Sequence, residues 1–117
     1  MKIRIFDNKN GLLVSVSDVF DYLYEMEQLT ETQCRVLKWK ANTRIIATLA
    51  NQYKNGNVSM QINIFKFQDI FICWTDFAYL RSLFSEKQKQ NIGIMRLFWS
   101  LDSPHDIRTD KKLFTNE

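Results

Sequence analysis

The chain has 117 residues, of which 45% are hydrophobic and 14% aromatic, and its formal net charge is +3. A chain of this length can bury a core without disulfide or metal support. It has no run of about eighteen apolar residues that could span a membrane, and residues 1–10 lack the apolar stretch of a signal peptide. We therefore expect a cytoplasmic protein in which Cys34 and Cys73 are buried free thiols.

The first predicted element is a β-hairpin. Apolar and polar residues alternate over residues 2–6 and over residues 12–16, a pattern typical of strands with one buried face. Between them, the pair Asn10-Gly11 can adopt the positive backbone torsions of a tight turn. The sequence therefore predicts two antiparallel strands at the start of the chain.

Two helices are predicted next. The first covers residues 19–28, and an oxygen of Ser17 or Asp18 can cap its first turn. The second covers residues 30–53 and begins with TETQ, which has the form of a capping box. Apolar residues recur along this second helix at a spacing of three or four, which places them on one stripe: Cys34, Leu37, Ala41, Ile45 and Leu49.

Part of the second helix has an alternative interpretation. Residues 29–41, LTETQCRVLKWKA, resemble the opening of a LuxR-type helix-turn-helix, and residues 45–49 and 57–64 can be aligned with its later parts. The resemblance implies a turn and a recognition helix in place of one continuous helix. The tract lacks a glycine at the turn, and the spacing between Trp39 and Ile46 is short. One helix and a helix-turn-helix are therefore both open from the sequence.

The second half of the chain gives a similar order of elements. Strands are predicted over residues 58–67 and 70–74, followed by a helix over residues 76–84 that Thr75 caps. SEKQ, at residues 85–88, is a second capping box, and we expect the helix that it opens to carry Ile92, Met95, Leu97 or Phe98, and Trp99. Since proline cannot continue a helix, this last helix should end at Asp102-Ser103-Pro104.

The predicted order is therefore ββααββαα. It corresponds to an α+β fold of four antiparallel strands, arranged as two hairpins, with helices on one face. We expect a single domain over residues 1–102 and a polar, loosely held C-terminal tail over residues 103–117. KIRIF at residues 2–6 is similar to QINIF at residues 61–65, which raises the hypothesis of an internal pseudo-duplication.

Residues that carry catalysis or bind metals are scarce. The only histidine is His105, with no cysteine or serine arranged beside it in the sequence. Three glycines are too few for a glycine-rich phosphate loop, and no set of metal ligands has a recognisable spacing. The sequence predicts a protein that is not an enzyme and that holds no cofactor or metal ion.

Charged residues are separated by sign along the chain. They are all acidic over residues 12–34 (Asp18, Asp21, Glu25, Glu27 and Glu31) and all basic over residues 32–68 (Arg35, Lys38, Lys40, Arg44, Lys54 and Lys66). At about 100° per residue, one side of the long helix gathers Lys40, Arg44, Asn51 and Lys54. This side is a candidate binding surface for an acidic protein or for phosphates. Alternatively, the acidic and basic helices are neighbours whose charges face each other or solvent.

Aromatic residues are dense between residues 65 and 79. Phe65, Phe67 and Trp74 form a candidate patch for a protein partner or for a second copy of the chain. Two other interpretations are a sheet buried on one face, and base stacking around Lys66 on an aromatic platform.

Segregated charge, many aromatics and the lack of a reactive constellation favour a small protein that acts by contact with another protein. Such a protein would be an inhibitor, an immunity-type protein or a regulatory module. The alternative is a DNA-binding regulator that places Lys40, Arg44 and Lys54 against phosphates.

Overall fold

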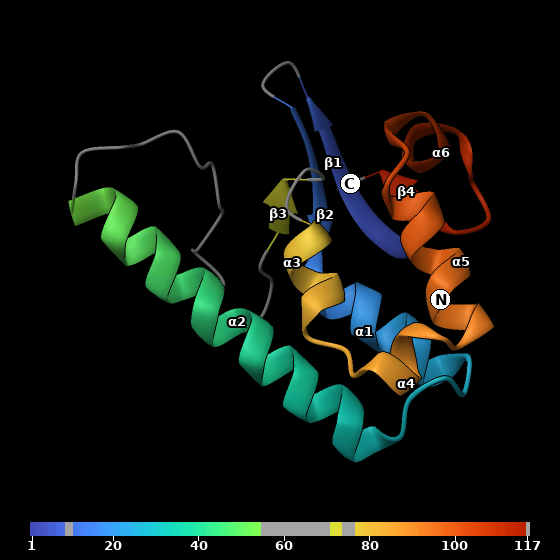
Figure 1. The fold of residues 1–117 in the computed structure, drawn as a ribbon. Coiled ribbons are helices and arrows are strands. Elements are labelled where there is room, and N and C mark those ends of the chain that lie inside the picture. Colours follow the sequence, from blue (N-terminus) through green and yellow to red (C-terminus); the bar gives the residue numbers. More distant parts are fainter. Residues whose placement is uncertain (9–10, 55–70, 74–76, 117) are drawn as a thin grey trace.

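A computed structural model describes residues 1–8, 11–54, 71–73 and 77–116 (Figure 1). Its elements in chain order are β1 (Ile3–Asn8), β2 (Gly11–Ser15), α1 (Val16–Glu25), α2 (Glu31–Lys54), β3 (Phe71–Cys73), α3 (Phe77–Ser82), α4 (Glu86–Lys89), α5 (Ile92–Leu101), α6 (Pro104–Thr109) and β4 (Phe114–Asn116).

The predicted first hairpin is confirmed. Strands β1 and β2 pair antiparallel, with Ile5 opposite Val14 and Asn8 opposite Gly11. Ile3 and Ile5 are buried, whereas the alternate residues Arg4 and Phe6 are partly exposed. This is the pattern expected of a strand with one buried face. The hairpin thus presents one apolar face to the core.

The prediction of four antiparallel strands in two hairpins is wrong. The sheet is mixed, in the order β3-β2-β1-β4: β3 pairs antiparallel with β2, and β4 pairs parallel with β1 through Ile3 and Phe114. A parallel neighbour needs a long connection, and the chain from β1 to β4, which includes α1 to α6, provides it. The class is α+β, but the described elements of the second half do not repeat those of the first. Of the predicted second hairpin, residues 58–70 lie outside the described part of the chain.

Helix α1 starts earlier than predicted, and Ser15 caps it instead of Ser17 or Asp18. The Ser15 hydroxyl accepts a hydrogen bond from the Asp18 amide at 3.2 Å. The Asp18 carboxylate instead accepts three bonds from Arg4, one from the backbone amide and two from the guanidinium, at 2.8–3.1 Å. Asp18 is buried and is therefore committed to holding α1 against β1.

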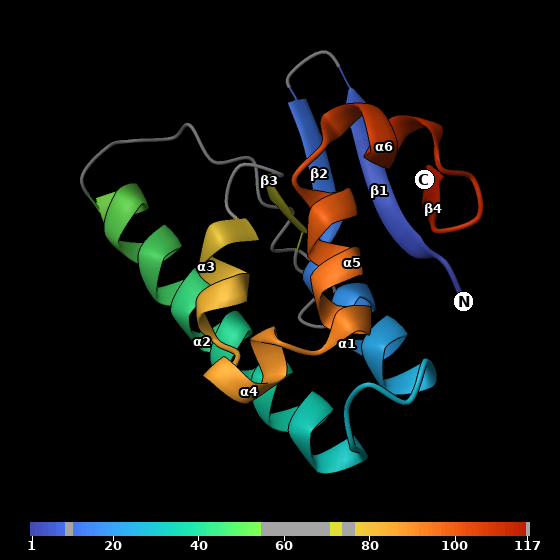
Figure 2. The same ribbon diagram turned by 45° about the vertical axis from the view of Figure 1, so that its right-hand side comes forward.

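The predicted long helix is confirmed as one continuous helix, α2, so the helix-turn-helix interpretation is wrong. Its capping box is present: the Gln33 amide donates to the Thr30 hydroxyl at 3.1 Å, and the Thr30 amide donates to the Gln33 side chain at 3.0 Å. No residue between 31 and 54 is glycine or proline, so nothing in the sequence favours a turn. Helix α2 lies beside α1 along one side of the molecule (Figures 1 and 2).

The predicted last helix is instead two helices. The capping box at Ser85 is present, but it opens only the short α4, and Asn91 then caps α5 through the amides of Gly93 and Ile94. The Asn91 side chain competes for helical amides, which explains the break before Ile92. Helix α5 stops before Pro104, as predicted.

Residues 104–116, which the sequence suggests are part of a loose tail, form α6 and β4. Pro104 occupies the first turn of α6, where its missing amide is not needed, and the Ser103 hydroxyl caps that turn. Ile107 and Phe114 are almost fully buried, and the Arg108 guanidinium pairs with Asp7 at 3.0 Å. This segment therefore contributes a strand and two core residues.

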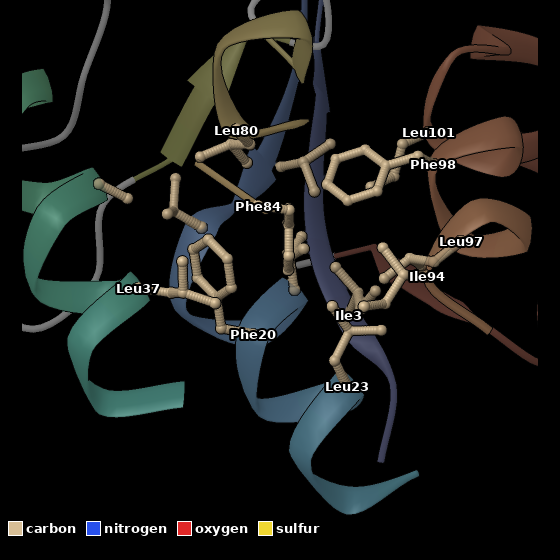
Figure 3. Packing of buried hydrophobic residues seen from close by; sticks show 14 of the residues in the cluster. Ile3, Phe20, Leu23, Leu37, Leu80, Phe84, Ile94, Leu97, Phe98 and Leu101 are labelled. Atoms are coloured by element: carbon tan, nitrogen blue, oxygen red, sulfur yellow. The ribbon is translucent and has the colours of Figure 1, made fainter. Parts of the chain in front are cut away.

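The core lies between the hairpin and the helices. Figure 3 shows side chains of β1, α1, α2, α3 and α5 directed toward one another. The rings of Phe20 and Phe84 have centroids 5.9 Å apart, and Phe84 meets Phe98 edge to face at 5.5 Å. These aromatic contacts connect α1 to α5 through Phe84.

Candidate functional site

Helix α2 has a buried side and an exposed side that match the sequence pattern. Cys34, Leu37 and Ala41 are buried against the core. Trp39 is two residues from both Leu37 and Ala41, which places it about 200° around the helix from each. Its side chain is accordingly 66% exposed. Trp39 therefore points away from the core. It lies in the first half of the helix, where most of the side chains are described.

Other residues of α2 share this orientation. Val36 is 43% exposed, and Lys40 and Thr43 are also exposed. Together, Val36, Trp39, Lys40 and Thr43 form what we call the α2 ridge. It has an aromatic centre, apolar and polar neighbours and a cationic edge, which is a composition common at protein interfaces.

The structure locates Lys40, the first residue of the basic side that the sequence predicts for α2. Lys40 is exposed on α2 and forms no ion pair with the residues that the structure describes. Arg44, Asn51 and Lys54 belong to the same helix, but their side chains are not described. The structure thus locates one of the four predicted residues on the surface and leaves the position of the other three side chains open.

The predicted aromatic patch cannot be examined in the same way. Phe65, Phe67 and Trp74 lie outside the described residues. The hypothesis that they bind a partner stays a prediction.

The acidic residues of α1 are largely committed to partners within the chain. Asp21 accepts from the Lys38 ammonium of α2 at 2.9 Å, and Glu25 pairs with the N-terminal ammonium at 3.1 Å. The interpretation of α1 and α2 as neighbours whose charges face each other is therefore confirmed for Asp21 and Lys38. Among the basic residues of α2 whose side chains are described, Lys40 is therefore the one without an ion pair to a described residue.

The Cys34 thiol is buried beneath this contact and donates a weak hydrogen bond to Asp21 at 3.6 Å. Burial, with the negative charge of Asp21 as a second cause, raises the pKa of the Cys34 thiol to about 11. At neutral pH the group is an inert thiol, as the sequence predicts for Cys34. The side chain of Cys73 is not described.

A second exposed surface lies on α5, and the sequence analysis did not find it. Ile92 and Trp99 are 66% and 63% exposed, and Arg96 between them is exposed as well. Residues separated by seven positions return to the same side of a helix, so these side chains form one line, which we call the α5 ridge. The opposite side of α5 carries Ile94, Leu97, Phe98 and Leu101, all buried.

Two hollows border the α5 ridge. A groove of about 620 Å³ separates α5 from the end of α1, and its walls include Tyr22, Met26, Ile92, Arg96, Leu97 and Leu113. A smaller hollow of about 140 Å³ lies on the other side, where Trp99 and Met95 face Arg81 and Lys89. The ridge is therefore a raised apolar line between two depressions.

Gly93 and Gln28 both line the larger groove. A side-chain carbon at position 93 would lie 2.6 Å from Cδ of Gln28, so a larger residue there would require the Gln28 side chain to move. Gln28 is held by its own bond to the Met26 carbonyl at 2.9 Å. Gly93 and Gln28 thus meet where the groove lies between α5 and the residues that follow α1.

A cluster of metal ligands and a membrane-spanning helix are both absent from the described residues. His105 is exposed on α6, and no group of three or more His, Cys, Asp or Glu residues in this part of the chain could hold a metal ion. No helix within it is long and apolar enough to cross a bilayer. The α2 ridge and the α5 ridge with its groove are therefore the candidate binding surfaces in this part of the chain.

Comparisons with known proteins give no further direction. No protein-family model matches the chain, and neither the curated proteins nor the solved structures contain a match.

Proposed function

We propose that the protein acts by binding another protein through the α2 ridge, in the cytoplasm and without catalysing a reaction. The observation that carries this proposal is the exposure of Trp39, opposite the buried stripe of α2. A large aromatic side chain held rigidly on a helix loses little entropy on binding. Tryptophan is also enriched among the residues that dominate interface energies, where its truncation commonly costs about 2 kcal/mol or more.

The charges beside Trp39 support a partner with an acidic surface. Lys40 is adjacent to it and exposed, and the helix continues toward Arg44 and Lys54. Arg35 lies on the other flank, although it pairs with Glu31 at 3.0 Å on the helix surface. Basic residues at an interface rim steer an acidic partner and increase the association rate. The aromatic centre would then set the dissociation rate.

The mode of action would be occlusion. A partner surface covered by α2 is unavailable to other molecules, which is how an inhibitor, an immunity-type protein or a regulatory module works. The predicted aromatic patch of Phe65, Phe67 and Trp74 would extend the contact, and a second copy of the chain is an alternative partner.

The experiment is an affinity capture from the native host with nuclease-treated lysate. It compares the wild-type protein with the Trp39→Ala variant, and uses Trp99→Ala as a control because Trp99 is equally exposed on another helix. We expect a captured protein that is lost with Trp39→Ala and retained with Trp99→Ala. Capture that is unchanged by Trp39→Ala, or that disappears with nuclease, would contradict the proposal.

A second candidate function is DNA binding, and the exposure of Lys40 on the helix whose sequence also contains Arg44 and Lys54 favours it. If these residues contact phosphates, affinity for generic duplex DNA should fall steeply with salt. Removing each charge should then lower the salt slope by about one unit. An anisotropy titration of the wild-type protein and the triple alanine variant at two salt concentrations separates the two functions. The continuous helix α2 offers no recognition helix of the LuxR type, so we rank DNA second.

A further inference from the structure

We propose that the groove between α1 and α5, together with the α5 ridge, binds an amphipathic helix of another protein that places a carboxylate opposite Arg96. This surface is separate from the α2 ridge, and it does not depend on the function proposed above. The inference rests on three features: an exposed apolar line, a hollow beside it, and a cation between the two ends of the line that no described residue pairs.

The apolar line has the length of a helical contact. Ile92 and Trp99 are separated by seven residues, or about 10.5 Å along the helix. Both side chains are more exposed than buried, although they belong to a helix whose opposite side is packed in the core. Two turns of a second helix laid along α5 would cover both of them.

The groove supplies the space for side chains of that helix. Its volume is about 620 Å³, and most of its walls are apolar. Met26 contributes a flexible wall from the end of α1, and its side chain is 52% exposed. Apolar residues at positions i, i+3 or i+4, and i+7 of an incoming helix would enter the groove while its backbone crosses the ridge.

The charge of the site selects an acidic partner. Arg96 is a wall of the groove and forms no ion pair within the described ranges. Lys111 and Lys112 are exposed immediately before Leu113, another wall residue. By contrast, Arg81 at the smaller hollow is already paired with Asp102 and lies over the ring of Phe98 at 5.5 Å. A carboxylate in the groove would therefore meet a guanidinium that is free to form two parallel hydrogen bonds.

Two other occupants fit less well. A second copy of the chain, packed antiparallel along α5 about a twofold axis, would bring two Arg96 guanidinium groups together, because Arg96 is near the middle of the ridge. A membrane surface would contact Ile92 and Trp99 but would leave the groove beside them unfilled. An incoming helix can fill the groove with its side chains, and a carboxylate on that helix can pair with Arg96.

A displayed library of random peptides biased toward helix is the probe. The library is selected on the wild-type protein and depleted on an Ile92→Glu/Trp99→Glu variant. We expect enriched peptides with apolar residues at helical spacing and an Asp or Glu on the flank of that face. Their binding, measured by fluorescence anisotropy, should weaken at least tenfold with Trp99→Ala and with Arg96→Glu, and should be unchanged by Trp39→Ala.

A charge exchange gives the decisive result. Replacing the peptide carboxylate by lysine should abolish binding to the wild-type protein and restore it to the Arg96→Glu variant. Binding that survives Arg96→Glu, or a library that yields no peptide dependent on Trp99, would overturn the proposal. Two further results would do the same: a wild-type dimer in sedimentation that dissociates with Trp99→Ala, or binding to anionic vesicles that is lost with Trp99→Ala. Circular dichroism melts of each variant verify that it is folded.

Discussion

Helices α2 and α5 present tryptophan in the same local arrangement and yet form different surfaces. Trp39 is two residues from the buried Leu37 and Ala41, and Trp99 is two residues from the buried Leu97 and Leu101. The two side chains are 66% and 63% exposed. In both helices, packing of one side directs the aromatic ring outward.

The surroundings distinguish them. Trp39 is next to an exposed lysine on the basic side of α2, whereas the α5 ridge is bordered by two hollows. The comparison teaches that exposure of a tryptophan indicates a contact surface but not its kind. A raised aromatic with cations suits the face of an acidic protein, and an apolar line beside a groove suits an inserted helix.

The largest effects should come from the buried sides of the two helices. Phe98→Ala should lower the free energy of unfolding by about 3–5 kcal/mol and Leu37→Ala by about 2–5 kcal/mol, because each leaves a cavity. We expect Phe98 to cost more, since its ring contacts both Phe84 and Arg81. Urea unfolding measures both values. A loss below about 1 kcal/mol for either variant would mean that the buried side of that helix is wrongly assigned.

The reactivity of Cys34 tests the orientation of α2. Because burial raises the pKa of this thiol from 9.0 to about 11, the folded protein should hold about 100-fold less thiolate at neutral pH. The stability from the protonated thiol is fully present below pH 9.0 and is lost as the pH rises through about 11. Asp21→Asn should lower this pKa and Lys38→Met should raise it.

The measurement is the pH dependence of alkylation, with the adduct assigned to Cys34 by mass spectrometry. Labelling should be slow in the native protein and fast after denaturation. Rapid native labelling would place Cys34 on the exposed side of α2 and remove the argument for the α2 ridge.

A smaller effect is expected at the C-terminal end of α1. Glu27 has φ of 60°, in the left-handed region, where it ends α1 by donating its amide to the Tyr24 carbonyl. Side chains other than glycine are strained in this conformation, so Glu27→Gly should raise the free energy of unfolding by up to about 1 kcal/mol. Thermal unfolding tests this, and a destabilised variant would show that the Glu27 side chain has a stabilising role.

The smallest effect on folding should come from the two tryptophans themselves. Trp39→Ala and Trp99→Ala remove little buried surface, so each should change the free energy of unfolding by no more than about 0.5 kcal/mol. A larger loss for one of them would show that its side chain packs within the protein. The comparison between the two ridges would then no longer hold.

Much of the first half of the fold could be predicted from the sequence because its signals are local. Alternation defines β1 and β2, and the capping box with an apolar stripe defines α2. The cap of α1 was assigned wrongly because Ser15, Ser17 and Asp18 are all suitable side chains. The Asp18 carboxylate is engaged by Arg4, a tertiary contact that the local sequence does not reveal.

The second half depends on long-range contacts, and local patterns cannot supply them. Strand β4 pairs in parallel with β1, and Phe114 lies opposite Ile3 from the other end of the chain. Because a parallel pair is not joined by a tight turn, the local sequence gives no signal for it. Helix α5 is apolar on nearly every side, so periodicity could not separate the buried Leu97 from the exposed Ile92. The α5 ridge was missed for this reason. Trp39 was also absent from the predicted site residues, although its position two residues from both Leu37 and Ala41 of the apolar stripe indicates an outward side chain.

The most direct test of the central claim is photocrosslinking in the native host from position 39. A photoreactive amino acid replaces Trp39 in one protein and His105, an exposed residue of α6, in a control. We predict a crosslinked species from position 39 that resists nuclease, is digested by protease and is absent from position 105. No protein crosslink at position 39, or an adduct that nuclease removes, would contradict the binding of a protein partner by the α2 ridge.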